Sequence, residues 1–461
     1  MTEEIFKMRF NKAYVILSFI TVVLCFFIMF YPVLTLSSIV LILATYLFFK
    51  DSKLGIFFLL FSALVIDKLI IIVVGYQIDS FFYYSYLFSI LFIFLNKVLH
   101  KKRVLFADSI LDKTLFLFSI VLIVSIHFVS TDKAYGFEKF QLYLTSIVLF
   151  YLPVLLTKQK NDIFVYYEGI FYFGLILVIF GIIQLLGYET YAGKHHNGRL
   201  SILSLNPIWV GRYLSYSILV EIYMIIKYCK TGLKNVTKLI IVSAVGLLQL
   251  SLIILTGSRG PLLALLIAGS YYVISRQKFN FRKIIPFLLG VVLIITLILM
   301  IIPTNISERI LNLSSSGQIT VLIRVLANIE AYNNFKENIF QGIGFGSYKF
   351  GNAFLGKLIY PHNVFMEMLS ETGIFGFLLF LFIVFYPVIL FWRRIEKLGP
   401  DLSSLIFSLF IAAFINANIS GHIGANYYLW FSMGVMYSSI NLTKSNLSPS
   451  SNDSYGSMII Q

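Results

Sequence analysis

Long uncharged apolar runs dominate this sequence and limit the folds open to it. One example is IIPFLLGVVLIITLILMII at 284–302, and similar runs recur along the chain. A helix of about 20 apolar residues crosses the roughly 30 Å hydrocarbon core of a bilayer. Of all residues, 59% are hydrophobic and only 12% are charged, about half the charge of an average soluble chain. The sequence therefore predicts an all-α polytopic membrane protein.

Apolar periodicity predicts about 12–14 transmembrane helices. The fourteen predicted spans are 13–30, 33–49, 55–75, 80–95, 110–129, 140–156, 163–186, 206–226, 237–256, 259–275, 284–302, 364–391, 402–416 and 421–440. The spans 80–95 and 402–416 are short, and 13–49 is also compatible with one bent hairpin around Pro32.

The formal net charge of +15 does not indicate nucleic acid binding, because most Lys and Arg residues fall on one side of the predicted spans. With the N-terminus inside, the inside connections hold clusters such as HKKR at 100–103 and WRRIEK at 392–397. This bias follows the positive-inside rule and predicts that both termini are cytoplasmic. The exceptions are 187–205 and 130–139, which carries Lys133 and Lys139.

The predicted organisation has four parts. Transmembrane helices 1–11 occupy 1–303, an extracytoplasmic loop occupies 304–361, helices 12–14 occupy 362–440, and a disordered cytoplasmic tail rich in Ser and Asn occupies 441–461. Within the loop, apolar residues recur at the spacing of one helical face: Val321, Leu322, Val325, Leu326 and Ile329. We expect this segment to be an amphipathic helix lying on the outer membrane surface.

Arg259 stands at the outer end of a predicted helical hairpin, within LTGSRGPLLALL at 255–266. Charge beside hydrocarbon is costly, so this arginine is either a snorkelling anchor or a functional group. Gly257 and Gly260 have no side chains and leave the backbone around it accessible, and Pro261 suits the first turn of a helix. A guanidinium beside a helix N-terminus is a good site for a phosphate.

Two further residues on the predicted outward side, Arg324 and His362, also have either a structural or a functional interpretation. Arg324, in the amphipathic segment, can bind lipid headgroups or a substrate phosphate. His362 follows Pro361 at the start of a span, where the positive end of the helix dipole disfavours protonation. A neutral imidazole there can accept a proton, or it can cap the helix. Glu367, five residues on, falls on a different helical face and is not expected to orient His362.

Motifs for metal or nucleotide chemistry are not found in the sequence. No outward loop holds a cluster of acids suited to a divalent cation. There is also no GxSxG elbow and no phosphate-binding loop of the Walker type. The sequence therefore predicts no metal site and no cofactor.

Three stretches resemble the bacterial O-antigen ligase and polysaccharide polymerase superfamily, membrane glycosyltransferases of the GT-C type. They are LTGSRGPLLALL at 255–266, IRVLANIEAYNNFKENIFQGIGFGSY at 323–348 and PHNVFMEMLSETGIFGFLLF at 361–380, and they occur in the family's order. In the last stretch, His-Asn opens a helix and a glycine follows eleven residues after the histidine. GRLSILSLNPIWVGRYL at 198–214 is similar to the family's Arg-then-Asn-Pro stretch, with Ser or Leu where the family usually has a glycine.

The resemblance implies that a saccharide held on undecaprenyl diphosphate moves to an acceptor sugar hydroxyl outside the membrane. Arg259 and Arg324 match the family's diphosphate-binding arginines, and His362 matches its proposed base. Substrate-binding roles are expected for Arg199, Arg212 and Asn363. The two arginines are expected to matter less for activity than Arg259 and to contact the acceptor glycan. The implied setting is the bacterial cytoplasmic membrane.

Three functions remain open at this point. The main expectation is a polymerase of lipid-linked repeat units for capsule, exopolysaccharide or O-antigen. The near alternative is a ligase that transfers finished glycan to a lipid or protein acceptor, and the distant one is a lipid-linked oligosaccharide flippase. The expected partners are the lipid-linked donor, the glycan acceptor and membrane lipid, with a flippase and a chain-length regulator as further candidates and no nucleic acid.

Overall fold

The computed structural model describes residues 110–186, 199–202, 205–230, 235–275, 315–352 and 356–445. The chain divides into two compact units, Met1–Ser89 and Ile90–Gln461, and all described residues belong to the second. The predicted spans before residue 110, the span at 284–302 and the tail beyond residue 445 lie outside the described residues.

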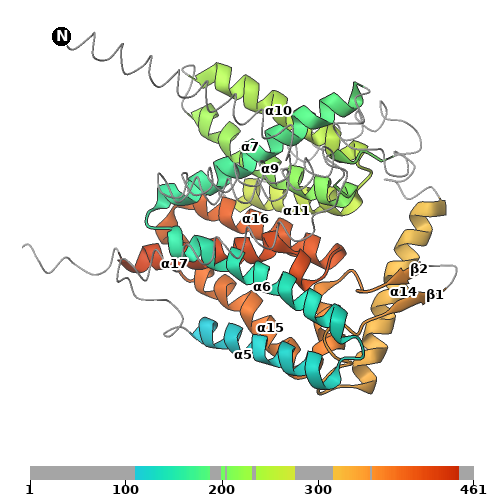
Figure 1. The fold of residues 1–461 in the computed structure, drawn as a ribbon. Coiled ribbons are helices and arrows are strands. Elements are labelled where there is room, and N and C mark those ends of the chain that lie inside the picture. Colours follow the sequence, from blue (N-terminus) through green and yellow to red (C-terminus); the bar gives the residue numbers. More distant parts are fainter. Residues whose placement is uncertain are drawn as a thin grey trace, which may run out of the picture. The chain divides into compact units, whose positions relative to one another are not determined.

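The described part is almost entirely helical (Figure 1). Its helices are α5 (Ile110–Val124), α6 (Lys133–Leu156), α7 (Lys160–Leu185), α9 (Pro207–Lys230), α10 (Val236–Leu255), α11 (Arg259–Ser275), α14 (Ser315–Glu337), α15 (Val364–Trp392), α16 (Pro400–Ile419) and α17 (Tyr427–Ser445). A π-helical turn, Ser125–Val129, continues α5. Two short strands, β1 (Phe350–Asn352) and β2 (Gly356–Leu358), pair antiparallel.

Six of the described helices are long and apolar enough to cross a membrane, and α11 is apolar but shorter. The six are Ile110–Val129, Lys133–Leu156, Lys160–Ile182, Val236–Leu255, Val364–Trp392 and Pro400–Ile419. The predicted all-α polytopic membrane fold is therefore confirmed, with the β1–β2 hairpin as a small addition that hydropathy does not reveal.

The helices bury one face against each other and leave apolar residues on the other. α9 packs against α7, α10 and α11, while α16 packs against α11 and α17, and α15 packs against α5 and α17. The rings of Tyr143 and Trp430, both fully buried, meet edge to face at 5.5 Å between centroids where α6 packs on α17. On α10, Ile240 and Ile241 are 62% and 56% exposed, as expected for side chains that face lipid.

The predicted connection 130–139, which holds Lys133 and Lys139, is shorter in the structure than expected. α6 already begins at Lys133, and the carboxylate of Asp132 caps it by accepting a hydrogen bond from the Tyr135 N–H at 3.2 Å. The first turns of α6 are polar, so a hydropathy window places the start of the span too late. Lys139 consequently lies inside a helix, where its side chain is fully buried.

The predicted amphipathic helix is present as α14, which packs against α15. Its predicted apolar face points away from the protein, with all five side chains between 36% and 56% exposed. The opposite side is buried through Ala327 and Ala331. A helix that exposes its apolar side and buries small residues suits a lipid interface; its placement on the outer membrane surface stays a prediction.

The glycine-rich segment after α14 docks on a break in α15. At Gly373 the backbone has φ 62° and ψ −166°, a region that favours glycine. The Ile374 N–H donates to the Ile339 carbonyl instead of to its own helix, and the freed Ser370 carbonyl accepts from the Ile343 N–H. A Cβ on Gly373 would press against the main chain of Phe340. Close contact with this main chain therefore explains why a glycine stands eleven residues after His362.

Candidate active site

Three of the arginines singled out from the sequence meet at one pocket. It is lined by Arg199, Ile208, Gly257, Ser258, Arg259, Gly260, Pro261, Arg324, Ile419 and Ser420. The pocket joins the N-terminus of α11, the side of α14 that bears Arg324 and the C-terminal end of α16. Segments more than a hundred residues apart in sequence therefore bring several positive charges to a single place.

The N-terminus of α11 forms one wall of this pocket. α11 begins at Arg259, after Gly257 with φ 59°, and the first N–H groups of any helix lack acceptors within the helix. Arg199 braces this turn because its Nε–H donates to the Thr256 carbonyl at 2.7 Å and its guanidinium donates to Ser258 Oγ at 2.9 Å. The wall thus combines a helix dipole with guanidinium groups, and this combination favours anions.

α14 connects the pocket to the segment that carries His362. Arg324 lines the pocket, and one turn later the Asn328 amide donates to the Arg324 carbonyl at 2.7 Å and to the Pro361 carbonyl at 3.3 Å. Pro361 directly precedes His362. The position of the histidine is therefore tied to the helix that carries a pocket arginine.

His362 adopts an unusual backbone conformation. Its φ is 61°, and it is the one residue other than glycine with a positive φ among the described residues. Strained backbone of this kind tends to occur at functional sites. Its ring lies edge on to the Tyr360 ring, 4.7 Å between centroids. Its Nδ1 atom is buried without a hydrogen-bond partner in the described part of the chain.

The surroundings keep the His362 imidazole neutral. Burial, followed by the positive charges of Arg324 and Arg212, lowers the pKa of His362 from 6.5 to about 4. With a pKa of about 4, the ring is uncharged at neutral pH, and its unprotonated nitrogen can accept a proton. The neutral ring was predicted from the helix dipole, and in the structure burial and the two arginines also favour it.

Arg212 lies beside the pocket but not in its lining. Its guanidinium is buried and donates to the carbonyls of Asn416 and Ser420, both at 2.6 Å, and to Asn426 Oδ1 at 3.2 Å. It also lies 4.6 Å from the centre of the Trp209 ring. The guanidinium thus holds the end of α16 and the following loop in place.

Asn363 caps α15. Its side-chain oxygen accepts hydrogen bonds from the N–H groups of Phe365 and Met366 at 3.0 and 3.2 Å. The cap therefore belongs to Asn363 and not to His362, which leaves the imidazole for another role. The Asn363 side-chain nitrogen is the group that can still donate to a ligand.

Two features next to this site were not predicted from the sequence. Lys139 forms ion pairs with Glu367 and Glu371, which lie one turn apart on α15. His422, in the loop 420–426 between α16 and α17, places its ring 5.6 Å from that of Tyr360. Burial and the charge of Lys139 lower the pKa of His422 to about 3. The available signal for the ion pairs was two acids one turn apart within an apolar span.

Within the described ranges, no group of three or more His, Cys, Asp or Glu side chains could hold a metal ion. The charged groups that line the pocket are arginines, which act on anions directly through N–H donors.

Part of the chain that contains this site is similar to a known family. No curated protein matches the chain. Residues 244–381 match the family model described as O-antigen ligase, a segment that contains Arg259, Arg324 and His362. The match confirms the resemblance seen in the sequence and supports an enzymatic role. The chain is therefore a multi-pass membrane protein in which residues 244–381 match the O-antigen ligase family, as the resemblance to the ligase and polymerase superfamily implied.

Proposed function

We propose that the protein polymerises lipid-linked polysaccharide repeat units by moving a saccharide from undecaprenyl diphosphate to an acceptor sugar hydroxyl. The observation that carries this proposal is the convergence of Arg199, Arg259 and Arg324 on one pocket. A neutral His362 lies next to Pro361, which is hydrogen-bonded to α14, the helix that bears Arg324. A diphosphate is the leaving group that such a cluster of guanidiniums suits best.

The chemistry needs one proton acceptor and one stabiliser of negative charge. The acceptor hydroxyl gives its proton to the His362 imidazole as its oxygen bonds to the anomeric carbon. The bond between that carbon and the phosphate oxygen breaks, and the electron pair stays on the diphosphate. Arg259 and Arg324 neutralise the charge that develops there, without a metal ion. A positioned base contributes about 10²–10⁴-fold in rate.

The other residues act around this centre. Arg199 both lines the pocket and braces the α11 turn, so it is placed to touch the diphosphate. Arg212 supports the pocket through the Ser420 carbonyl, and Asn363 offers its side-chain nitrogen to the acceptor glycan. We place the site on the extracytoplasmic side of the bacterial cytoplasmic membrane, supplied by a lipid-linked oligosaccharide flippase and working beside a chain-length regulator.

The glycan profile of a deletion strain tests the polymerase assignment. We expect loss of the gene to leave single repeat units, because no further unit is added to the growing chain. Mass spectrometry and gel electrophoresis of carrier-linked and surface glycan measure the length distribution. Complementation with the wild-type gene should restore long chains, and complementation with His362→Asn should not.

The same profile identifies the near alternative. Long chains that accumulate on the lipid carrier in the deletion strain would contradict the polymerase assignment and establish a ligase. Both reactions share the donor, the leaving group and the base, so the roles of Arg259, Arg324 and His362 would be the same in either case.

A further inference from the structure

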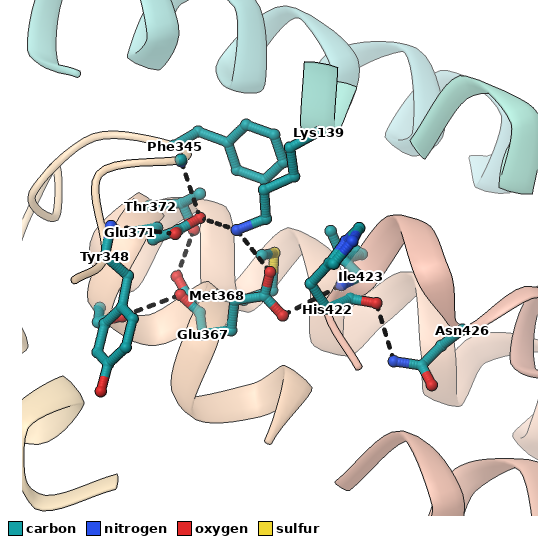
Figure 2. Close-up of polar contacts among 12 residues, drawn as sticks. Lys139, Phe345, Tyr348, Glu367, Met368, Glu371, Thr372, His422, Ile423 and Asn426 are labelled. Carbon is teal, nitrogen blue, oxygen red and sulfur yellow. Dashed lines mark hydrogen bonds and ion pairs between the residues drawn. The ribbon is translucent and has the colours of Figure 1, made fainter. Parts of the chain in front are cut away.

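A lysine and two glutamates form a buried charged cluster behind the candidate active site. Lys139 Nζ lies 2.5 Å from Glu367 Oε1 and 2.5 Å from Glu371 Oε2, and all three side chains are 0% exposed. Figure 2 shows the ammonium group between the two carboxylates, with the Phe345 ring beside it. The ammonium also lies 4.6 Å from the centre of that ring. The cluster, hereafter the Lys139 cluster, joins α6 to α15.

A cluster of this composition is a poor way to stabilise a fold. Removing charges from water costs several kcal/mol per ion, and well-packed apolar residues often serve as well or better. The two carboxyl groups also accept hydrogen bonds from main-chain N–H groups of two loops, which suggests a role for the cluster beyond packing.

Each glutamate holds a different loop. Glu371 accepts hydrogen bonds from the N–H groups of Gly346 and Tyr348 at 3.1 and 3.4 Å, in the glycine-rich loop 342–348. Glu367 accepts from the Ile423 N–H at 3.1 Å, in the loop 420–426. Figure 2 shows Ile423 and His422 next to the Glu367 carboxylate. The two loops are therefore anchored to neighbouring turns of α15.

The loop 420–426 reaches the candidate active site through Ser420 and His422. Ser420 lines the arginine pocket, and the carbonyl of Ser420 accepts from Arg212. His422 contacts the Tyr360 ring, which in turn contacts His362. The loop is thus held by Arg212 on one side and by Glu367 on the other, between the pocket and the histidine.

We propose that Lys139, Glu367 and Glu371 are positioning residues that fix the loops 420–426 and 342–348 so that the arginine pocket and His362 keep their relative placement. None of the three touches the substrate in this account. Lys139 holds the two carboxylates in place, and the carboxylates hold the loops. This inference rests on the proposed function, because it assigns the reaction geometry as the purpose of the cluster.

Paired substitutions at Glu367 separate loop anchoring from charge. Both Glu367→Gln and Glu367→Met leave Lys139 and Glu371 as a one-to-one ion pair, so neither strands an unpaired buried charge. Glutamine retains an oxygen that can accept from the Ile423 N–H, whereas methionine fills a similar volume without an acceptor. We expect Glu367→Met to lower kcat by about ten to a hundredfold, the scale of a misplacement of about 1 Å, and Glu367→Gln to lower it less.

Donor binding should survive in both variants. The pocket arginines Arg259 and Arg324 come from α11 and α14, so the KM for the lipid-linked donor should stay within about twofold of wild type. Lys349→Met provides the matched control. It breaks the ion pair between Lys349 and Asp132, whose side chains are 42% and 31% exposed, and such exposed pairs contribute little. Its kcat and KM should equal those of the wild type.

Hydrogen–deuterium exchange provides a readout that does not depend on activity. Glu367→Met should increase exchange in 420–426 and leave 342–348 protected, while Glu371→Met should do the reverse. Wild-type kcat in Glu367→Met, or a kcat loss that only tracks loss of folded protein by thermal melting, would overturn the positioning role. Exchange that rises equally in both loops would also contradict it. A wild-type protein that transfers no saccharide, with loop-specific exchange intact, would instead refute the proposed function.

Discussion

Arg259→Ala is expected to lower transfer by about 10²–10³-fold, with the protein still present in the membrane. Loss of one preorganised donor to a developing anion has an effect of that size. Alanine is a good helix former, so α11 should still begin at this position. Arg259→Lys should recover only part of the activity, because an ammonium lacks the bidentate fork of a guanidinium.

A second arginine at a helix end serves as the matched control for Arg259. Arg393 is exposed and caps the C-terminus of α15, away from the pocket. Arg393→Ala should leave transfer unchanged, since an anchoring side chain can be lost at little cost. Rates are measured with purified variants in proteoliposomes at equal protein. Wild-type transfer by Arg259→Ala would return Arg259 to the role of a membrane anchor.

His362→Asn should lower kcat by about 10²–10⁴-fold and leave donor binding intact. Asparagine tolerates the positive φ of His362 better than other residues with a side chain, so the backbone is retained while the base is lost. His362→Ala should be equally inactive and somewhat less stable, because alanine does not favour this conformation. Transfer by His362→Asn within a few fold of wild type would show that another group takes the proton.

The pKa of about 4 for His362 also predicts the form of the pH profile. Falling pH protonates the ring and removes the base, so kcat/KM should be flat from pH 8 to about pH 5 and fall below that. Bound diphosphate brings negative charge to Arg324 and offsets its effect on the ring. The acid limb of kcat, which reports the donor complex, should therefore lie at higher pH than that of kcat/KM. An acid limb of kcat at lower pH than that of kcat/KM would contradict the electrostatic effect of Arg324 on His362.

Local patterns in the sequence predicted most of the described helices and the helix N-terminus at Arg259. Apolar periodicity located the described apolar helices to within a few residues, apart from the early start of α6 and the loop before α17, and six of these helices are long and apolar enough to cross a membrane. Glycines around Arg259 and a proline after it predicted a helix N-terminus there, and α11 begins at that residue. These features depend on neighbouring residues, which a single sequence displays directly.

The Lys139 cluster depends on contacts that a single sequence does not display. Lys139 and Glu371 are separated by 232 positions, and nothing in the run 130–139 identifies its partner. The break at Gly373 is similar, because its freed hydrogen bonds are completed by the loop after α14. The positive φ of His362 is likewise a feature that the sequence does not display.

Transfer by the purified protein in proteoliposomes shows whether the protein forms a glycosidic bond without a metal ion. A lipid-linked repeat unit with a fluorescent sugar is supplied with acceptor glycan and EDTA, and both the extended glycan and the released undecaprenyl diphosphate are measured. We expect one undecaprenyl diphosphate to be released for each glycosidic bond formed, at a rate that Mg²⁺ and Mn²⁺ do not change. A strict requirement for a divalent metal would contradict the arginine mechanism, and movement of the lipid-linked saccharide between leaflets without a new glycosidic bond would contradict the transferase itself.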